Sequence, residues 1–155
     1  RNRVPVLIGY DDMHVAVDAS SVKGKYTIDG SKDHTLIEEV KEIHSGFGTL
    51  KGVMALKEQY QEAVATGDAN LKADAEAKYQ QAIVEKDEMI KEMLLEGLDN
   101  KAYLGVLELL YNDVLRPELH ADFFRKVSGR LNKDLPEAVI TKRFNSYVKT
   151  IQNNE

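Results

Sequence analysis

The sequence contains no cysteine among its 155 residues. A chain without thiols forms no disulfide, offers no thiolate nucleophile and builds no zinc site from cysteine ligands. Thiol chemistry is therefore excluded as an activity of this chain by itself. The absence does not fix a compartment, because it suits a cytosolic protein and an envelope protein of this size equally well.

A long apolar run is also missing. No stretch approaches the roughly 20 consecutive apolar residues that a membrane-spanning helix needs, and no apolar run of the signal-peptide type lies near the start. We therefore expect no membrane span. The sequence begins with Arg1 rather than methionine, and we expect it to be a mature or trimmed soluble piece.

Proline and glycine are few, with three and ten residues respectively. Hydrophobic residues make up 43% of the chain and charged residues 30%, which is the balance of a folded soluble protein rather than of a disordered tail. A chain of this length suits one domain, or one small domain with an appendage, and can bury a sizeable core.

The net charge of −5 is unevenly distributed. Residues 1–115 hold 13 basic and 21 acidic side chains, whereas residues 116–155 hold 8 basic and 5 acidic ones. This basic excess is far below the dense lysine and arginine surface that neutralises several phosphates, so we expect no binding to nucleic acid. It favours an electrostatic match within the protein or between domains.

The first thirty residues have the pattern of a small antiparallel sheet. Three short segments rich in β-branched residues are separated by turns, and they predict strands over 4–9, 13–18 and 25–29. Alternation over 13–18 predicts a strand with one buried face. An apolar sheet edge invites association, so we expect the edge at Val4 to Ile8 to be covered or paired with another copy.

After Gly30 and Ser31 the periodicity becomes helical. Six apolar residues follow at alternating spacings of four and three, which places them on one helical stripe: Leu36, Val40, Ile43, Phe47, Leu50 and Met54. Glycines at 46, 48 and 52 each cost a helix roughly 1 kcal/mol relative to alanine. The sequence therefore predicts a kink, a break or a close helix crossing within this stripe, and an end at Gly67 and Asp68.

Four further helices are predicted, the first over about 71–96. The second has Asn100 as its cap and a mostly apolar composition, which predicts a buried centre. The last two begin with Pro117 and Pro136 in their first turns, with Leu119 and Val139 among the inward residues and Gly129 in a helix-ending role. The predicted fold class is α+β and mostly α: a short β segment over 1–30, which also fits the end of a truncated β domain, and a bundle of about five helices over 31–155.

The corner at Gly30 and Ser31 is the first candidate site. It lacks the spaced glycines and the lysine of a phosphate-binding loop, and it lacks the three glycines of a dinucleotide loop. Ser31 is predicted to cap the following helix, and Asp33 in the first turn would repel a bound phosphate. We interpret the junction as a structural corner.

Histidine and serine candidates are weak. Helical di-metal sites place glutamate three residues before histidine, but Lys41 precedes His44 at that spacing and Pro117 precedes His120. The group of Asp11, Asp12 and His14 fits a polar turn better than a metal site. The Ser45-Gly46 pair lacks the context of a nucleophile elbow. We therefore assign no catalytic, cofactor-binding or metal-binding residue.

The order of segments carries a resemblance: VPVLIGYDDMHVAVD, KYTIDGSKDHTLIEEV, YQEAVATGDANLKADAEAKYQQAI, DNKAYLGVLELLY and LPEAVITKRFNSYVKTIQ. It resembles the non-catalytic N-terminal region, often described as a domain of unknown function, of envelope thioredoxin-like (AhpC/TSA-type) thiol:disulfide oxidoreductases of Gram-negative bacteria. The resemblance implies a periplasmic or lipid-anchored location and a downstream Cys-x-x-Cys domain. That motif is absent here, so no catalytic residue of the family has a position in this chain.

Three hypotheses are compatible with these features. The first is a non-enzymatic accessory domain that positions or presents a thioredoxin-like domain in cis, or contacts another protein. The second is a free-standing α-helical module that binds a protein or a ligand; it lacks the fixed period near 34 residues of helical repeats. The third is an enzyme whose polar groups converge only in three dimensions. The sequence leaves the oligomeric state open.

Overall fold

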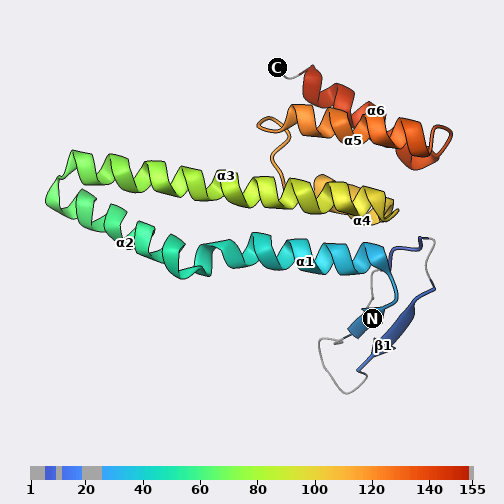
Figure 1. The fold of residues 1–155 in the computed structure, drawn as a ribbon, viewed down its shortest axis with the longest axis horizontal. Helices are drawn as coiled ribbons and strands as arrows, with labels where there is room; N and C mark the ends of the chain where they lie inside the picture. The colour runs from blue at the N-terminus through green and yellow to red at the C-terminus, as the bar shows by residue number, and fades with distance from the viewer. Residues whose placement is uncertain (1–5, 10–11, 19–25, 154–155) are drawn as a thin grey trace. The chain divides into compact units, whose positions relative to one another are not determined.

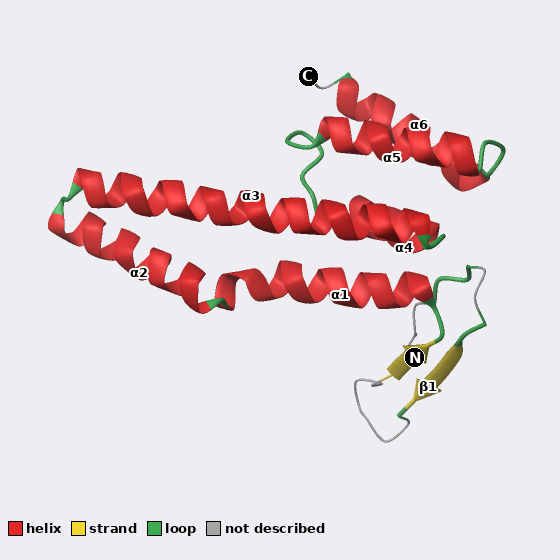
Figure 2. Cartoon of the chain, in the orientation of Figure 1, coloured by secondary structure: helices red, strands yellow, loops and turns green. Residues whose placement is uncertain are grey.

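The computed structural model describes residues 6–9, 12–18 and 26–153. These form two strands, six α-helices and one short 3-10 helix, in the order β1 (His14–Val17), β2 (Tyr26–Asp29), α1 (Lys32–Gly46), η1 (Phe47–Thr49), α2 (Lys51–Thr66), α3 (Ala69–Asp99), α4 (Tyr103–Tyr111), α5 (Ala121–Asp134) and α6 (Val139–Gln152) (Figures 1 and 2). The predicted class, α+β and mostly α with a small N-terminal antiparallel sheet, is confirmed.

Contacts divide the chain into two compact units. The core unit is Arg1–Glu38 with Met93–Glu155, and the hairpin unit is Glu39–Glu92. Each boundary falls inside a helix, α1 or α3, so these two long helices contribute to both units. The division expected from sequence, a β segment over 1–30 and a bundle over 31–155, stays a prediction.

The strands β1 and β2 pair antiparallel, with Val17 opposite Tyr26 and Val15 opposite Ile28. The predicted buried face of the strand over 13–18 is wrong. All four residues of β1 are exposed, and of the described strand residues Ile28 alone is buried. A two-stranded ribbon presents little area for a helix to cover, which explains why β-branched residues here remain in water.

Residues 6–9, the described part of the first predicted strand, are not a strand. The backbone N–H of Leu7 instead donates a hydrogen bond to Nε2 of His34, at 2.9 Å. This segment is therefore tied to the first turn of α1, and its described residues form no sheet edge. Val4 and Pro5 lie outside the described residues.

The predicted break in the first helical stripe is confirmed. Helix α1 ends at Gly46, η1 follows, and Leu50 has an extended backbone with φ −61° and ψ 135°. The break also changes the helical phase, because a 3-10 turn has three residues rather than 3.6. Leu50 and Met54, predicted to lie on one helical stripe with Leu36 and Val40, are 56% and 48% exposed, whereas Val53 is buried.

Three helix ends share one geometry. After α2, α3 and α4, a left-handed residue is followed by an N–H that bonds a carbonyl five residues back: Asp68 to Ala63, Ala102 to Gly97, and Val114 to Leu109. The left-handed residues are Gly67 (φ 72°), Lys101 (φ 64°) and Asp113 (φ 57°). The predicted end at Gly67 is thus confirmed.

Glycine at position 113 should stabilise the protein, because a left-handed backbone is strained for residues with a Cβ atom. We expect Asp113→Gly to raise the free energy of unfolding by about 0.5–1 kcal/mol, and Gly67→Ala to lower it by about 1 kcal/mol. Urea unfolding followed by circular dichroism measures both. A lower unfolding midpoint for Asp113→Gly would contradict the helix-end interpretation.

Helices α5 and α6 begin later than predicted. Pro117 lies in a turn in which the His120 N–H bonds the Arg116 carbonyl, and α5 begins at Ala121. Leu119 and Val139, predicted to be inward, are 64% and 62% exposed. Gly129 lies inside α5 and does not end it, so that prediction is wrong. The helix continues because Leu131, beyond this glycine, is completely buried and outweighs the local propensity.

The core unit has α4 at its centre, as its apolar composition predicted. Six of the nine α4 residues are buried. Beside the end of α4, rings of Tyr111, Phe124, Phe144 and Tyr147 form a cluster with centroid distances of 5.2 to 6.2 Å. The first turn of α4, at the other end of the helix, contributes to the lining of a pocket in the same unit.

Candidate functional site

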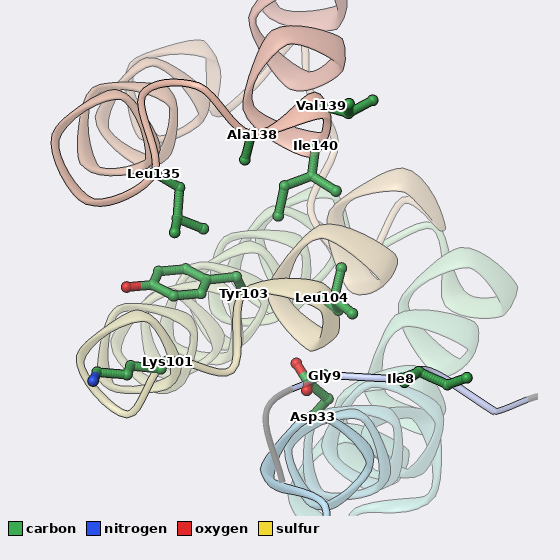
Figure 3. A pocket seen from close by; sticks show the side chains of 10 residues that line it. All are labelled: Ile8, Gly9, Asp33, Lys101, Tyr103, Leu104, Leu135, Ala138, Val139 and Ile140. Atoms are coloured by element: carbon green, nitrogen blue, oxygen red, sulfur yellow. The ribbon is translucent and has the colours of Figure 1, made fainter.

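The candidate site, called the α4 pocket here, lies in the core unit at the start of α4. It has a volume of about 320 Å³ and is lined by Ile8, Gly9, Asp33, Lys101, Tyr103, Leu104, Leu135, Ala138, Val139 and Ile140 (Figure 3). Four parts of the chain meet there: the segment 6–9, the first turn of α1, the junction of α3 with α4, and the connection between α5 and α6. The lining is predominantly apolar, which is typical of binding pockets.

Asp33 is the buried polar group of the pocket, with an exposed fraction of 2%. Its Oδ1 accepts a hydrogen bond from the backbone N–H of Gly105, at 2.7 Å and across 72 residues of sequence. Gly105 is the third residue of α4, whose first amides have no partner within the helix. Asp33 therefore caps α4 from α1, where its negative charge also complements the helix dipole.

Two glycines make room for Asp33. A Cβ atom on Gly105 would lie 2.7 Å from the Asp33 carbonyl oxygen and 2.9 Å from its Cα. A Cβ atom on Gly9 would lie 2.6 Å from Asp33 Oδ2. Such distances are below van der Waals contact, so the segment 6–9, α1 and α4 meet closely only because glycine occupies both positions.

Asn100, predicted to cap α4, does not do so. The cap position is Ala102, which makes no side-chain cap bond. Asn100 and Lys101 instead belong to the left-handed turn that ends α3, where the Lys101 N–H bonds the Leu98 carbonyl. That turn brings Lys101 to the edge of the pocket, and in Figure 3 its ammonium group points away from the other lining residues.

Tyr103 connects the pocket to a charged network. Its hydroxyl donates to Asp134 Oδ2 at 3.0 Å, and Nε of Arg130 donates to the same oxygen at 2.7 Å. Arg130 also bonds Asp99 at 2.7 Å, so the network joins the end of α3, the start of α4 and the end of α5. The Arg130 hydrogen bond, with a smaller contribution from Tyr103, lowers the pKa of Asp134 below its ordinary value of 3.8.

Acid should weaken this network. A carboxyl whose pKa is lowered by folding stabilises the protein at pH values above its ordinary pKa, and this contribution is lost as pH falls through the lowered pKa. At pH values below about 4, we expect the free energy of unfolding to decrease more steeply in the native chain than in Asp134→Asn. Urea midpoints at pH 7, 4, 3 and 2 measure the difference. Parallel pH profiles for the two chains would rule out this contribution.

The Gly30 and Ser31 corner is built as predicted. Gly30 has φ 85°, and a Cβ atom there would lie 2.5 Å from the Asp12 carbonyl oxygen. Ser31 is buried, and its Oγ accepts a hydrogen bond from the His34 N–H at 3.3 Å, which is the helix cap expected from sequence.

Removing this cap should have a moderate effect. We expect Ser31→Ala to lower the free energy of unfolding by about 1 kcal/mol, because the His34 amide loses its acceptor. Added phosphate should shift the unfolding midpoint of neither chain. Saturable protection of the Gly30 and Ser31 amides by phosphate would overturn the interpretation of this junction as a corner.

The other sequence candidates are scattered. Asp12 and His14 are exposed, and Asp11 lies outside the described residues. The Ser45 hydroxyl donates a hydrogen bond to the Lys41 carbonyl within α1. Burial, with a further contribution from Lys86, lowers the pKa of His44. Within residues 6–9, 12–18 and 26–153, no group of three side chains is arranged to hold a metal ion.

His120 stands at the cap position of α5, far along the chain from these groups. Across the same described part of the chain, no helix combines the length and the apolar character needed to cross a membrane.

Sequence reasoning missed the cap that Asp33 provides for α4 and the pocket beside it. A contact across 72 residues leaves no local pattern. One signal was present: Gly105 interrupts the apolar run YLGVLELLY, and a glycine inside a helix often marks close approach of another backbone. Comparison of the chain with family models, curated proteins and solved structures finds no match, so the geometry of the α4 pocket is the basis for assigning a function.

Proposed function

We propose that this chain is a non-enzymatic interaction domain whose α4 pocket receives an apolar side chain from a partner domain. The observation that carries the proposal is the apolar pocket together with two exposed residues on its lining, Ile8 (82% exposed) and Val139 (62% exposed). Large apolar side chains exposed around a pocket are typical of protein contacts, in which an anchor residue fills the pocket.

The partner we propose is a thioredoxin-like domain that carries Cys-x-x-Cys, linked in cis or separate, in the cell envelope. The order of segments along the chain supports this choice. Disulfide exchange proceeds through attack by a thiolate, so the chemistry would belong to the partner. The present chain would position the redox domain and affect which substrates reach it.

The test compares a Cys-x-x-Cys thioredoxin-like domain alone with the same domain joined to residues 1–155. Both are assayed on a small disulfide and on a protein disulfide. We expect the joined protein to differ from the redox domain alone on the protein substrate and to match it on the small one. If the joined protein and the redox domain alone have the same rate on each substrate, the accessory function is ruled out.

Val139 and Leu119 provide a matched pair for locating the contact. Both lie in the core unit and are similarly exposed, at 62% and 64%, but Val139 lines the pocket and Leu119 does not. Val139→Asp in the joined protein should abolish the difference on the protein substrate, because it places a charge where the partner's apolar side chain would lie. Leu119→Asp should leave that difference intact. Equal effects of the two substitutions would show that the partner does not bind at the α4 pocket.

A second candidate function is binding of a small amphipathic ligand. Its basis is the pocket volume of about 320 Å³, which lies within the roughly 300–1,000 Å³ of small-molecule sites, and the predominantly apolar lining. The apolar tail of an amphipathic ligand fits these features. A fluorescent fatty acid should bind the native chain and bind Ala138→Leu, which partly fills the pocket, at least tenfold more weakly. Equal affinity for the two chains would exclude this pocket as the ligand site.

A further inference from the structure

The hairpin unit carries a groove of its own between α2 and α3, called the hairpin groove here. Its volume is about 340 Å³, its floor includes Tyr60, Ala75 and Tyr79, and its walls include Lys57 on α2 and Glu76 on α3. The aromatic floor is held in place by neighbours. The Tyr79 ring lies 6.0 Å from that of Phe47, and Lys72 Nζ lies 5.6 Å from the Tyr60 ring.

Helix α2 presents a second apolar stripe beside this groove. Leu50, Met54 and Val64 are 56%, 48% and 56% exposed. Leu50 is the cap residue just before α2, and within the helix Met54, Lys57, Gln61 and Val64 follow spacings of three, four and three, which places these four on one helical face. The buried Val53, four residues before Lys57, and Ala63 mark the inward side of α2, which begins at the edge of this stripe. The exposed stripe therefore remains open to contact with another surface.

Charges on the groove walls are arranged symmetrically. Lys57 lies ten residues before Gly67, and Glu76 lies eight residues after Asp68. Because α2 and α3 run in opposite directions from the turn at these two residues, the offset of Lys57 from Glu76 along the helices is only about 3 Å. The backbone positions of a cation and an anion thus stand at nearly the same height on the two sides of the groove, and the flexible Lys57 side chain extends from there toward Gly48.

We propose that a second copy of this chain docks on the hairpin groove. Rotation about a two-fold axis parallel to the helices lays α2 over α3 of the second copy, and the four helices form an antiparallel bundle. This rotation brings each Lys57 opposite the Glu76 of the other copy, in two equivalent pairs. It also covers the exposed stripe of α2 in both copies.

Self-complementarity favours a second copy over an unrelated partner. An isologous interface requires that one patch carry both members of each contact, and the hairpin groove carries a cation and an anion at mirrored positions around apolar and aromatic residues. Helix α2 has 16 residues, so the shared surface is about 24 Å long and, at two helix diameters, about 20 Å wide. This corresponds to about 480 Å² on each copy and about 960 Å² in total, which is the size of a weak, readily dissociating contact.

The test exchanges the charges. Lys57→Glu creates two repulsive pairs in a homodimer, and so does Glu76→Lys. Each single variant should raise the dimer dissociation constant at least tenfold in sedimentation equilibrium. An equimolar mixture of the two variants should associate again, because both cross-pairs then join opposite charges. The double variant Lys57→Glu with Glu76→Lys should also associate.

Glu62→Lys is the control, since it makes the same charge change as Glu76→Lys on an exposed residue of α2 that neither lines the groove nor belongs to the exposed stripe. It should leave the dissociation constant of the native chain unchanged. Circular dichroism of every variant checks that the helices are retained. Native chain that sediments as a monomer throughout the concentration series would overturn the proposal, as would failure of the mixed variants to associate. Neither outcome bears on the α4 pocket, because Val139→Asp tests that site separately.

Discussion

Gly105→Ala is expected to destabilise the core unit by about 3 kcal/mol, a large effect for the addition of one methyl group. The new Cβ atom would lie 2.7 Å from the Asp33 carbonyl oxygen and 2.9 Å from Asp33 Cα. Both are backbone atoms of the α1 first turn, so no side-chain rotation relieves the overlap. The turn must move, and that movement also lengthens the 2.7 Å hydrogen bond from the Gly105 N–H to Asp33.

Gly129→Ala is the matched control for this prediction. Gly129 also lies inside a helix, but a Cβ atom there would meet nothing within 4 Å. Alanine should therefore stabilise α5 by about 0.5–1 kcal/mol through its better helix propensity. Guanidinium unfolding of both variants measures the two opposite effects. Equal changes at positions 105 and 129 would show that helix propensity, and not the approach of α1 to α4, governs Gly105.

Asp33→Ala is expected to lower the free energy of unfolding by about 2–3 kcal/mol. The substitution removes the acceptor of the Gly105 amide in a buried environment, and an unpaired buried donor retains its full desolvation cost. It also removes the negative charge that faces the start of α4. Amide exchange should show the loss in the first turn of α4 before it appears in α6.

Asp122 is the control for Asp33, because both are the second residue of a helix. Asp122 pairs with Arg125 at the surface and its side chain is 95% exposed. An exposed ion pair contributes little, so Asp122→Ala should change stability by less than about 1 kcal/mol. A comparable loss for the two alanine variants would contradict the interhelical role of Asp33 and reduce it to an ordinary first-turn charge.

Substitutions at Gly105 and Asp33 should also affect the α4 pocket. Its lining includes Asp33 and residues of the first α4 turn, Tyr103 and Leu104. Movement of that turn would change the pocket before the rest of the core unit unfolds. In the joined protein, Asp33→Ala is therefore expected to lose the rate difference on the protein substrate at temperatures where α5 and α6 remain folded. Val139→Asp, in contrast, should abolish the same rate difference with little change in the unfolding midpoint.

Sequence periodicity was sufficient to predict most of the helices and one helix end. The break after Gly46 and the end at Gly67 both result from glycine, which is costly inside a helix and favoured in the left-handed residue after it. The apolar composition of 103–111 was sufficient for a buried α4. These properties depend on neighbours within a few residues, which is the range over which propensity and periodicity act.

Periodicity failed where an irregular turn changed the phase. Leu50 and Met54 continue the spacing of Leu36 and Val40, yet the 3-10 turn between them rotates the later residues into water. The predicted burial of Leu119 and Val139 was wrong for a related reason. The prolines before these residues lie in turns, and the helices begin only after the prolines. Helix boundaries of this kind depend on which backbone carbonyls the turn satisfies, and a single sequence does not display that choice.

By itself, then, the sequence determined the class of the fold, the cap at Ser31, the buried α4 and the exclusion of thiol chemistry, because each depends on residue type and local spacing. Tertiary structure alone decided that Asp33 caps α4, that Gly105 and Gly9 make room for it, and that the α4 pocket and the hairpin groove exist. Those features join residues far apart in the chain, and the free energy of such contacts depends on distance in space, which no short-range pattern encodes.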